Sequence, residues 1–399
     1  MKIKVLHLLF FALLIPGFVW NIGYDIRLSN IIIILLLVHY FFHNKISKNK
    51  AFFLLVVLLL FLILQGNVAV YPLIQIVGIG IIVSALYTII NRNDIKEIVR
   101  LYLKVAIFIS IIALVQEIVA IFLHKDIMFF IKDLFNLRYS QGGYVANVFI
   151  RVSSIFPEPA HLGGFLTPAC YFALLSVFNK LSTGLKISKF KAMLILIAQI
   201  FTFSLLAYVG LVIVLLFIIK ELKMKYKLVL VLVFCVLAGS IFSYVKPIRN
   251  RVQAVINVRN NPYQNLSVYT LYTNGLVALQ TIRNYPLFGT GIGTFESNYK
   301  KYILDFVQED KIMTRQNSKD AASLLIRVIS EMGLLGLILL MFIAFNYKVK
   351  KYGTDIDYYY INNASLTYIM VYLLRMGNYL FVEFWFFVVL YIVSKKRTL

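Results

Sequence analysis

RVSSIFPEPAHLGGFL, residues 151–166, carries polar and charged side chains directly into a long apolar run. A residue that precedes proline avoids helical backbone, so Phe156 and Glu158 are expected to be extended. Pro159 suits the first position of a helix, because its missing N–H would have no partner there. The stretch therefore predicts a helix that continues into the apolar run. Glu158 lies at its N-terminus, where the helix dipole stabilises a carboxylate.

Three ionisable residues thus gather where this helix begins: Arg151, Glu158 and His161. One interpretation is an anchor at a membrane surface combined with a helix cap. The other is a functional site at the outer surface of the membrane. We favour the site, because ionisable residues beside a bilayer usually have a role.

The composition of the whole chain is that of a membrane protein. Of its 399 residues, 61% are hydrophobic and 14% are charged, whereas a soluble domain is about half apolar and about a quarter charged. Apolar runs of about 20 residues recur, and each is long enough to cross about 30 Å of hydrocarbon. The alternating pattern of an outer-membrane barrel is absent. We expect an all-α polytopic protein with a single integral membrane domain over residues 1–399.

About twelve membrane spans are predicted from the apolar runs. The first, which starts like a signal peptide but lacks a small-residue cleavage site, is interpreted as a retained helix. The spans cover approximately residues 4–20, 28–43, 51–65, 71–90, 102–123, 161–179, 191–204, 206–220, 227–244, 323–346, 360–375 and 378–394.

Basic residues give these spans an orientation. More than half of the 40 Lys and Arg residues fall in short loops that would all lie on the side of the N-terminus. Because short cytoplasmic loops carry the excess of positive charge, both termini are predicted to be cytoplasmic and the protein to lie in the cytoplasmic (inner) membrane. This topology explains the net charge of +23, so no nucleic-acid partner is expected.

Two predicted external segments are long, residues 124–160 and residues 245–322. The second contains ten basic and five acidic residues. Long loops inside a compact protein are uncommon without a function, so the chemistry is expected here. The two cysteines, Cys170 and Cys235, lie in apolar runs, and the five histidines are scattered. Neither a disulfide framework nor a metal site is predicted.

Arginines at the start of the large loop have two interpretations. Arg249 and Arg251 follow directly after a predicted span. A planar guanidinium group binds two phosphate oxygens at once, so the pair suits a phosphate. Arginines at the end of a span also extend toward lipid headgroups, and that alternative stays open.

The stretch TIRNYPLFGTGIGTFESNY, residues 281–299, is rich in glycine. Gly289, Gly291 and Gly293 permit a tight turn whose N–H groups are able to hold an anion. A plain turn is the alternative. Arg283 beside the turn favours phosphate.

In QNSKDAASLLIRVISEMGLLGLILL, residues 316–340, Asn317 and Asp320 precede the tenth span. Arg327 and Glu331 are four residues apart and share one helix face. They form either an ion pair that fixes packing or part of a substrate site. Two further carboxylates, Glu117 and Glu383, fall inside spans, where ionisable residues are functional by default, but the sequence names no partner for them.

The order of these stretches resembles the bacterial O-antigen polymerase and ligase superfamily. Members typically show an Arg–Ser–Phe–Glu–Pro stretch entering a middle span, a Pro-x-x-Gly-x-Gly stretch in a large external loop, and then a Glu-x-Gly-x-x-Gly helix. Here these correspond to RVSSIFPEPAHLGGFL, NYPLFGTGIGTFESNY and NSKDAASLLIRVISEMGLLGL. The resemblance covers about residues 150–340, and the predicted topology extends it over the chain.

The resemblance implies an inverting, metal-independent glycosyltransferase of the GT-C type that needs no cofactor. Its substrates would be oligosaccharide repeats linked to the lipid carrier undecaprenyl diphosphate, and membrane lipid would surround the protein. At the external face, the growing glycan would pass to the incoming lipid-linked repeat, building O-antigen or a related surface polysaccharide. A chain-length regulator protein is a partner that the resemblance implies.

Residue roles follow from this resemblance and from charge. A leaving diphosphate needs positive charge where negative charge develops, and without a metal Arg151, Arg249, Arg251 and Arg283 are the candidates. The acceptor hydroxyl needs a base within hydrogen-bond reach, for which Glu158 is the first candidate and His161 the second. Contacts to substrate are assigned to Gly291, Asn317, Asp320 and Arg327.

Two departures from the family pattern bear on the activity. The ligase branch commonly has a His-Asn pair before the Glu-x-Gly helix, where this chain has Gln316-Asn317. An arginine that often follows the serine of the large loop is absent from NLSVYTLYTNGL. Both favour a polymerase over the alternative, an O-antigen ligase of the same fold. A transporter or flippase for lipid-linked sugars is the third alternative, but such proteins usually place polar sites at the bilayer midplane within repeats.

Overall fold

The protein is helical almost throughout its described length. The computed structural model describes residues 2–14, 19–21, 25–42, 70–128, 144–145, 149–181, 184–244, 246–258, 265–306, 317–352 and 355–398. The predicted span at residues 51–65 lies outside these residues.

Every other predicted span overlaps a helix. The first, predicted at residues 4–20, was placed too far along the chain at its end, because its helix ends at Leu14 and residues 19–20 belong to a strand. The helices are α1 (Lys2–Leu14), α2 (Leu28–Phe42), α4 (Val70–Arg92), α5 (Ile95–Leu123), α7 (Pro159–Val177), α8 (Lys189–Phe201), α9 (Leu205–Ile219), α10 (Met224–Tyr244), α14 (Leu324–Asn346), α15 (Ile356–Arg375) and α16 (Val382–Lys396).

Within the described residues, four helices are long and apolar enough to cross a membrane: Pro72–Arg92, Ile95–Leu123, Pro159–Val177 and Leu324–Asn346. Shorter apolar helices accompany them at Val5–Leu14, Leu28–His39 and Leu205–Ile219. A helical membrane protein is therefore in keeping with the structure, and the number of twelve spans stays a prediction.

The large loop predicted at residues 245–322 contains secondary structure of its own. It holds α11 (Lys246–Ile256), α12 (Leu266–Asn284), α13 (Phe295–Tyr302) and a 3-10 helix, η2 (Ile303–Asp305). Two small antiparallel sheets complete the described fold, β1 (Val19–Asn21) with β2 (Asp25–Arg27) and β3 (Tyr144–Val145) with β4 (Phe149–Ile150).

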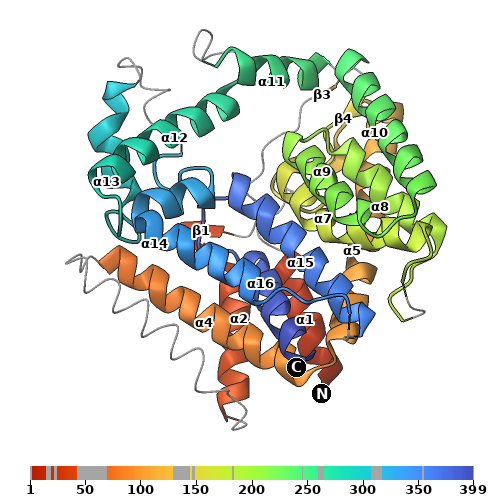
Figure 1. Ribbon diagram of the computed structural model, residues 1–399, viewed down its shortest axis with the longest axis horizontal. Coiled ribbons are helices and arrows are strands. Elements are labelled where there is room, and N and C mark those ends of the chain that lie inside the picture. Colours follow the sequence, from red (N-terminus) through yellow and green to blue (C-terminus); the bar gives the residue numbers. More distant parts are fainter. Residues whose placement is uncertain are drawn as a thin grey trace.

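The molecule has two distinct ends. The chain termini lie side by side at one end, whereas α11, β3 and β4 lie at the other, and α15 and α16 run between α7–α9 on one side and α12 and α14 on the other (Figure 1). Side-chain contacts join segments that were predicted to be cytoplasmic: Arg397 to the Asn91 carbonyl at 2.6 Å, Lys96 to Asp355 at 2.8 Å, Arg100 to the Gly184 carbonyl at 2.9 Å, and Lys351 to Glu221 at 2.6 Å.

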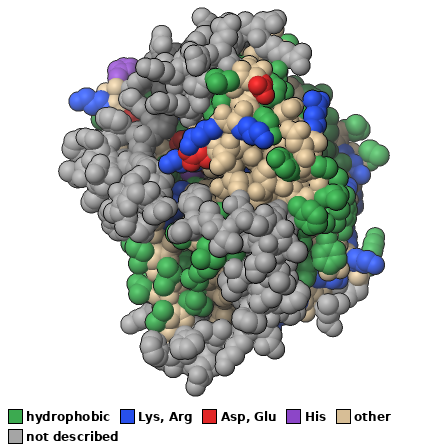
Figure 2. Space-filling view, turned by 90° about the vertical axis from the view of Figure 1, so that its left-hand side faces the viewer, with side chains coloured by type: hydrophobic (Ala, Val, Ile, Leu, Met, Phe, Trp, Pro, Cys, Tyr) green, Lys and Arg blue, Asp and Glu red, His purple; other side chains and the backbone are tan. Residues whose placement is uncertain are grey.

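Apolar side chains cover much of the outside of the helices. On α5, α10 and α14 large hydrophobic residues stay exposed, including Phe122 at 77% and Phe345 at 73%. On the face shown in Figure 2, hydrophobic side chains form patches beside and below a group of charged ones. Because soluble proteins rarely expose contiguous apolar surface on this scale, these helix faces suit contact with lipid.

The helix α7 is buried along most of its length and packs against α8, α9 and α15. Small residues allow the close approach to α9. A Cβ atom on Gly163 would lie 2.5 Å from the Cβ of Ala207, and one on Gly210 would lie 2.4 Å from Thr167 Oγ1. Such small-residue contacts are the usual way in which membrane helices approach closely, and here they hold the helix that begins at Pro159.

Gly163→Ala is expected to lower the thermal midpoint of the detergent-purified protein, because overpacking a core costs about 1–3 kcal/mol. Gly164→Ala is the matched control, since its Cβ would meet only Val371 Cγ1, at 4.0 Å. Equal midpoints for the two variants would contradict the close α7–α9 contact.

Candidate functional site

The segment just before α7 is held against α5 by hydrogen bonds from its backbone N–H groups to side chains of α5. The N–H groups of Ser153 and Ser154 donate to Gln116 Oε1 at 3.1 and 2.9 Å, and the N–H of Ile150 donates to Glu117 Oε1 at 3.2 Å. Ser154 has a positive φ of 50°, and its hydroxyl donates to the Ile109 carbonyl at 3.0 Å. Glu117, the intramembrane carboxylate without a predicted partner, therefore helps to hold this segment.

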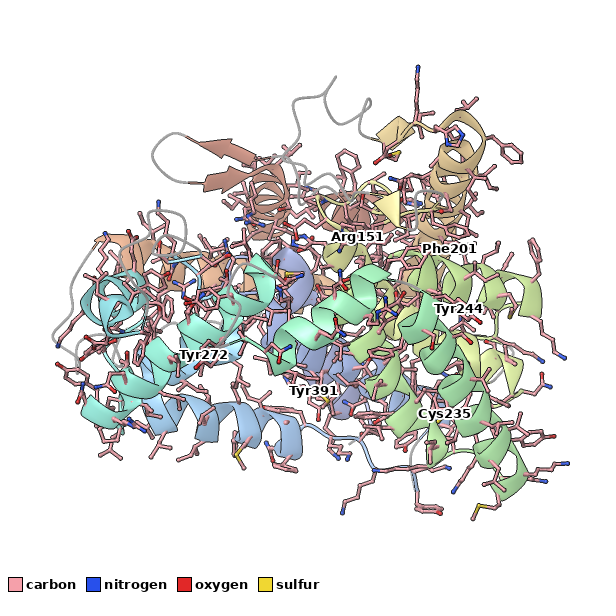
Figure 3. All side chains as sticks on the ribbon, turned by 90° about the horizontal axis from the view of Figure 1, so that it is seen from above. Arg151, Phe201, Cys235, Tyr244, Tyr272 and Tyr391 are labelled. Carbon is pink, nitrogen blue, oxygen red and sulfur yellow. The ribbon has the colours of Figure 1, made fainter. Side chains whose placement is uncertain are left out.

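Arg151 lies at the turn between α8 and α9. Its Nε donates to the Phe203 carbonyl at 3.3 Å, and the next residue, Val152, donates its N–H to the Phe201 carbonyl at 3.2 Å. Figure 3, which looks onto the molecule from above, shows Arg151 near Phe201, with Tyr244 of α10 nearer to it in that view than Tyr272 of α12. Arg151 is half-buried, and its Nε is anchored by this hydrogen bond.

Glu158 lies where the sequence predicts it, as the N-cap residue of α7 with Pro159 next. Its backbone is extended, with φ −140° and ψ 151°, and its carbonyl accepts from the N–H groups of His161 and Leu162 at 3.0 and 3.3 Å. Within the described residues its carboxylate caps no N–H of the helix, and the side chain is exposed. The backbone thus starts the helix, and the carboxylate faces outward.

Three charged residues from distant parts of the chain interact at this end of the molecule, and we call them the outer charged cluster: Glu158, Asp320 and Arg375. Arg375, at the end of α15, interacts electrostatically with both carboxylates and donates from Nη1 to the Ala322 carbonyl at 3.1 Å. Asn317 donates from Nδ2 to Asp320 Oδ1 at 3.0 Å. The start of α7, the residues before α14 and the end of α15 therefore lie near one another.

Arg327 is the centre of a buried network beside this cluster. It is 1% exposed and donates to Glu331 Oε1 at 2.9 Å, to the Gly377 carbonyl at 3.0 Å and to Gln75 Oε1 at 3.1 Å. Tyr379 lies under its guanidinium group, 4.3 Å from the ring centroid, and donates its hydroxyl to Glu331 Oε2 at 3.0 Å. This geometry matches the packing interpretation of the Arg327–Glu331 pair.

The network also positions the turn between α15 and α16 against the large loop. A Cβ atom on Gly377 would lie 1.6 Å from the Asp320 carbonyl oxygen, so only glycine fits there. Because Arg327 holds the Gly377 carbonyl, the buried network fixes the backbone on which Asp320 rests.

The glycine-rich stretch interlocks with a break in α14. At Gly333 the backbone leaves the helical region, with φ 59° and ψ −148°, and the freed N–H groups of Leu334 and Leu335 donate to the carbonyls of Pro286 and Leu287 at 2.9 and 3.1 Å. In return, the N–H of Gly291 donates to the Glu331 carbonyl at 2.9 Å. Two motifs about 40 residues apart are thus one structural unit.

The amides of the glycine-rich turn are engaged within the protein. Besides Gly291, the N–H of Gly289 donates to the Tyr285 carbonyl and that of Thr290 to the Ser330 carbonyl, both at 3.2 Å. Gly289, Gly291 and Gly293 all have positive φ. The sequence left open the alternative that this stretch is a plain turn. That alternative accounts for these hydrogen bonds and backbone angles. The assignment of Gly291 to substrate binding stays a prediction.

His161 lies in the first turn of α7 and lines a pocket together with residues of α15 and α16. Its ring packs edge-on against Phe381, with ring centroids 5.6 Å apart. Glu383, the second carboxylate predicted to lie in a span, lines the same pocket. The structure therefore brings both candidate bases, Glu158 and His161, to the start of one helix.

The remaining predicted arginines lie on the helices of the large loop. Arg249 is half-buried on α11, and Arg283 is exposed in the last turn of α12. Arg251 also belongs to α11, and its side chain lies outside the described residues. In Figure 1, α11 and α12 border the end of the molecule away from the termini. Diphosphate binding by these residues stays a prediction.

Three residues of the site were not assigned to it from the sequence: Gln75, Arg375 and Tyr379. A signal existed for two of them, because Gln75 is a lone amide in an apolar run and Arg375 ends a predicted span. Tyr379 gave no signal, since it is one of 26 tyrosines.

Comparison with known proteins agrees with the motifs. Residues 190–341 match the model of the family described as O-Antigen ligase, a region that includes the large loop, the glycine-rich turn and the Arg327–Glu331 pair. The match supports membership of the O-antigen polymerase and ligase superfamily. It supports a ligase- or polymerase-type function without separating the two. No curated protein matches the chain.

Proposed function

We propose that this member of the O-antigen polymerase and ligase superfamily polymerises lipid-linked oligosaccharide repeats, in a cytoplasmic membrane that it spans about twelve times with a GT-C-like fold. The carbohydrate is O-antigen or a related surface polysaccharide. The observation that carries the proposal is the outer charged cluster, in which the exposed carboxylate of Glu158 at a helix start and the carboxylate of Asp320 both lie within electrostatic range of Arg375. It lies at the end of the molecule opposite both termini, which the proposed topology makes the external face.

The proposed reaction is a single displacement with inversion. The acceptor hydroxyl of the incoming repeat gives its proton to the Glu158 carboxylate, and its oxygen attacks the anomeric carbon of the growing glycan. The bond from that carbon to the diphosphate breaks, so undecaprenyl diphosphate leaves with the electron pair. Glu158 then releases the proton to water. His161, three residues later on the same face of the helix, is the second candidate for the base.

Positive charge for the leaving diphosphate is assigned to arginines. Arg151 is held at Nε by the Phe203 carbonyl, which supports a fixed orientation of its guanidinium group. Arg249, Arg251 and Arg283 are the further candidates from the large loop. Preorganised charge of this kind stabilises the transition state without reorganisation during the reaction.

The residues assigned to substrate binding divide into two groups. Asp320 and Asn317 lie at the outer charged cluster, where they are placed to accept from and donate to sugar hydroxyl groups. Arg327 and Gly291 act through the buried network and the interlocked turn, so we assign them positioning roles. The Gln316-Asn317 pair in place of His-Asn favours polymerase over ligase, because the base is then supplied from α7.

Deletion of the gene tests the proposal. Surface polysaccharide separated on a gel is expected to show single repeats on the lipid acceptor, because ligation continues while polymerisation stops. Bare acceptor with polymer retained on its lipid carrier would instead indicate the ligase. Normal ladders after deletion would exclude both activities.

A further inference from the structure

The glycine-rich turn between α12 and α13 begins with an apolar tip. Tyr285, Pro286, Leu287 and Phe288 are consecutive in the chain and all exposed, Leu287 at 58%. Contiguous apolar surface on a protein marks contact with another molecule or with a membrane. The tip is therefore expected to have a partner, and its surroundings indicate which one.

The tip is continuous with the outer face of α14. The N–H groups of Leu334 and Leu335 donate to the carbonyls of Pro286 and Leu287, so the two backbones lie side by side. Leu334 and Leu335 are exposed, and so are hydrophobic residues farther along the helix: Ile338, Leu339, Met341, Phe342 and Phe345. The helix is long and apolar enough to cross a membrane. Its exposed apolar face therefore suits acyl chains, and the tip extends that face.

The length of α14 indicates the depth of the turn. Residues 334–346, beyond the break at Gly333, measure about 20 Å at about 1.5 Å per residue, whereas a span crosses about 30 Å of hydrocarbon. Lys348 follows soon after, so the missing length, about two helical turns, comes from the part of the helix before the break. The glycine-rich turn lies at this depth, because a Cβ atom on Gly333 would approach the Pro286 carbonyl oxygen and the Gly289 nitrogen to 2.7 Å.

The backbone of the turn meets the condition for entering a membrane. Non-helical backbone is tolerated at membrane depth only where protein or water satisfies its polar groups. The N–H groups of Gly289, Thr290 and Gly291 donate to carbonyls at 3.2, 3.2 and 2.9 Å, and the carbonyls of Pro286 and Leu287 accept from α14 at 2.9 and 3.1 Å. These backbone groups are therefore satisfied without water, while the side chains of the tip face outward.

We propose that the glycine-rich turn is inserted into the bilayer beside α14, with Leu287 and Phe288 against the acyl chains of the leaflet in which that helix begins. Residues beside the tip suit the level of the lipid headgroups, where tyrosine and basic residues gather. Arg283 precedes the tip in the last turn of α12, and Lys301 of α13 has its Nζ 5.9 Å from the centroid of the Tyr285 ring. The large loop is thereby anchored in the membrane instead of lying wholly outside it. The insertion does not depend on which glycan reaction the protein performs.

Spin-label accessibility tests this contact in full-length protein reconstituted in phosphatidylcholine nanodiscs. Cys235 is exposed and Cys170 is buried, so Cys235→Ser leaves a background in which an added cysteine takes the label. Nitroxides are placed at Leu287→Cys and, separately, at Phe288→Cys. In hydrocarbon a nitroxide collides often with dissolved oxygen and rarely with a water-soluble nickel chelate, whereas in water this order is reversed.

Two exposed reference positions calibrate the ratio of oxygen to nickel collisions. Ile338→Cys, at a residue that is 59% exposed on α14, reports hydrocarbon, and Lys300→Cys, at a side chain that is 73% exposed on α13, reports water. Labels at Leu287 and Phe288 are expected to match the ratio at Ile338 and to exceed the ratio at Lys300 severalfold. The ratio of the Lys300 reference at both turn positions would overturn the insertion.

A charged substitution gives a second measurement that needs no label. Leu287→Lys is expected to lower the thermal midpoint of the protein in nanodiscs by several degrees, because a charged side chain in hydrocarbon is costly. Leu304→Lys is the matched control, since this leucine is 57% exposed in η2 next to Asp305, and it is expected to melt like the parent protein. Equal midpoints for the two variants would contradict contact with lipid, because a leucine exposed to water tolerates lysine.

Discussion

Glu158→Gln is expected to lower the rate of polymerisation by roughly 10²–10⁴-fold, the usual contribution of a general base. The amide keeps the size of the side chain but does not take up the proton of the acceptor hydroxyl. Stability should be retained, because within the described residues the Glu158 carboxylate makes no capping hydrogen bond and the backbone carbonyl starts the helix. Rates are measured on purified protein with the lipid-linked repeat as substrate.

Two variants accompany this measurement. Glu97→Gln makes the same chemical change at an exposed glutamate in the first turn of α5, near the termini, and should leave the rate unchanged. His161→Gln should raise KM more than it lowers kcat, because His161 lies in the first turn of α7, beside the proposed base. If His161→Gln abolishes kcat while Glu158→Gln retains it, the roles of the two residues are exchanged.

Arg327→Leu is expected to lower the free energy of unfolding by about 3–5 kcal/mol, the effect of removing one partner from a buried ion pair. Glu331 is fully buried, and after the substitution its carboxylate would keep the Phe295 N–H and the Tyr379 hydroxyl as donors among the described residues. The Gly377 carbonyl and Gln75 would also lose their donor. The thermal midpoint of the detergent-purified protein should fall markedly.

The surface pair Lys300–Glu296 is a matched control, since it has the same i,i+4 spacing with a separation of 2.8 Å and an exposed lysine. Lys300→Leu should change stability by less than about 1 kcal/mol, as for exposed ion pairs generally. If Arg327→Leu melts at the same temperature as Lys300→Leu, the buried network does not hold the large loop to the turn between α15 and α16.

The helices were predictable because their signals are local. Apolar runs bounded by charge predicted a helix wherever a predicted span falls in the described residues, and the two prolines predicted the start of α7 at Pro159 with an extended Glu158. The contacts at the terminal end, such as Lys96 with Asp355, join segments that the distribution of basic residues had already grouped on one side. The helical content of the large loop was not predicted.

The partners within the site were not predictable in the same way. Arg375 was recognised as the end of a span, yet nothing near it in the sequence indicates Glu158 or Asp320, which are 217 and 55 positions earlier. No sequence pattern connects Gln75 with Arg327. Glu117 accepts a hydrogen bond from Ile150 only because β4 lies against α5. Such pairs arise from helix packing between distant segments.

The sequence by itself determined the class of protein, the course of the helices and the residues with chemical potential, because hydrophobicity, proline geometry and charge act within a few residues. Tertiary structure decided which of them work together. It joined the glycine-rich turn to the break at Gly333, buried Arg327 against Glu331, and brought Arg375 within electrostatic range of Glu158. The physical reason is that an unpaired polar group in an apolar surrounding costs several kcal/mol. Each buried donor therefore needs an acceptor, and only the packing of the whole chain determines which acceptor lies within reach.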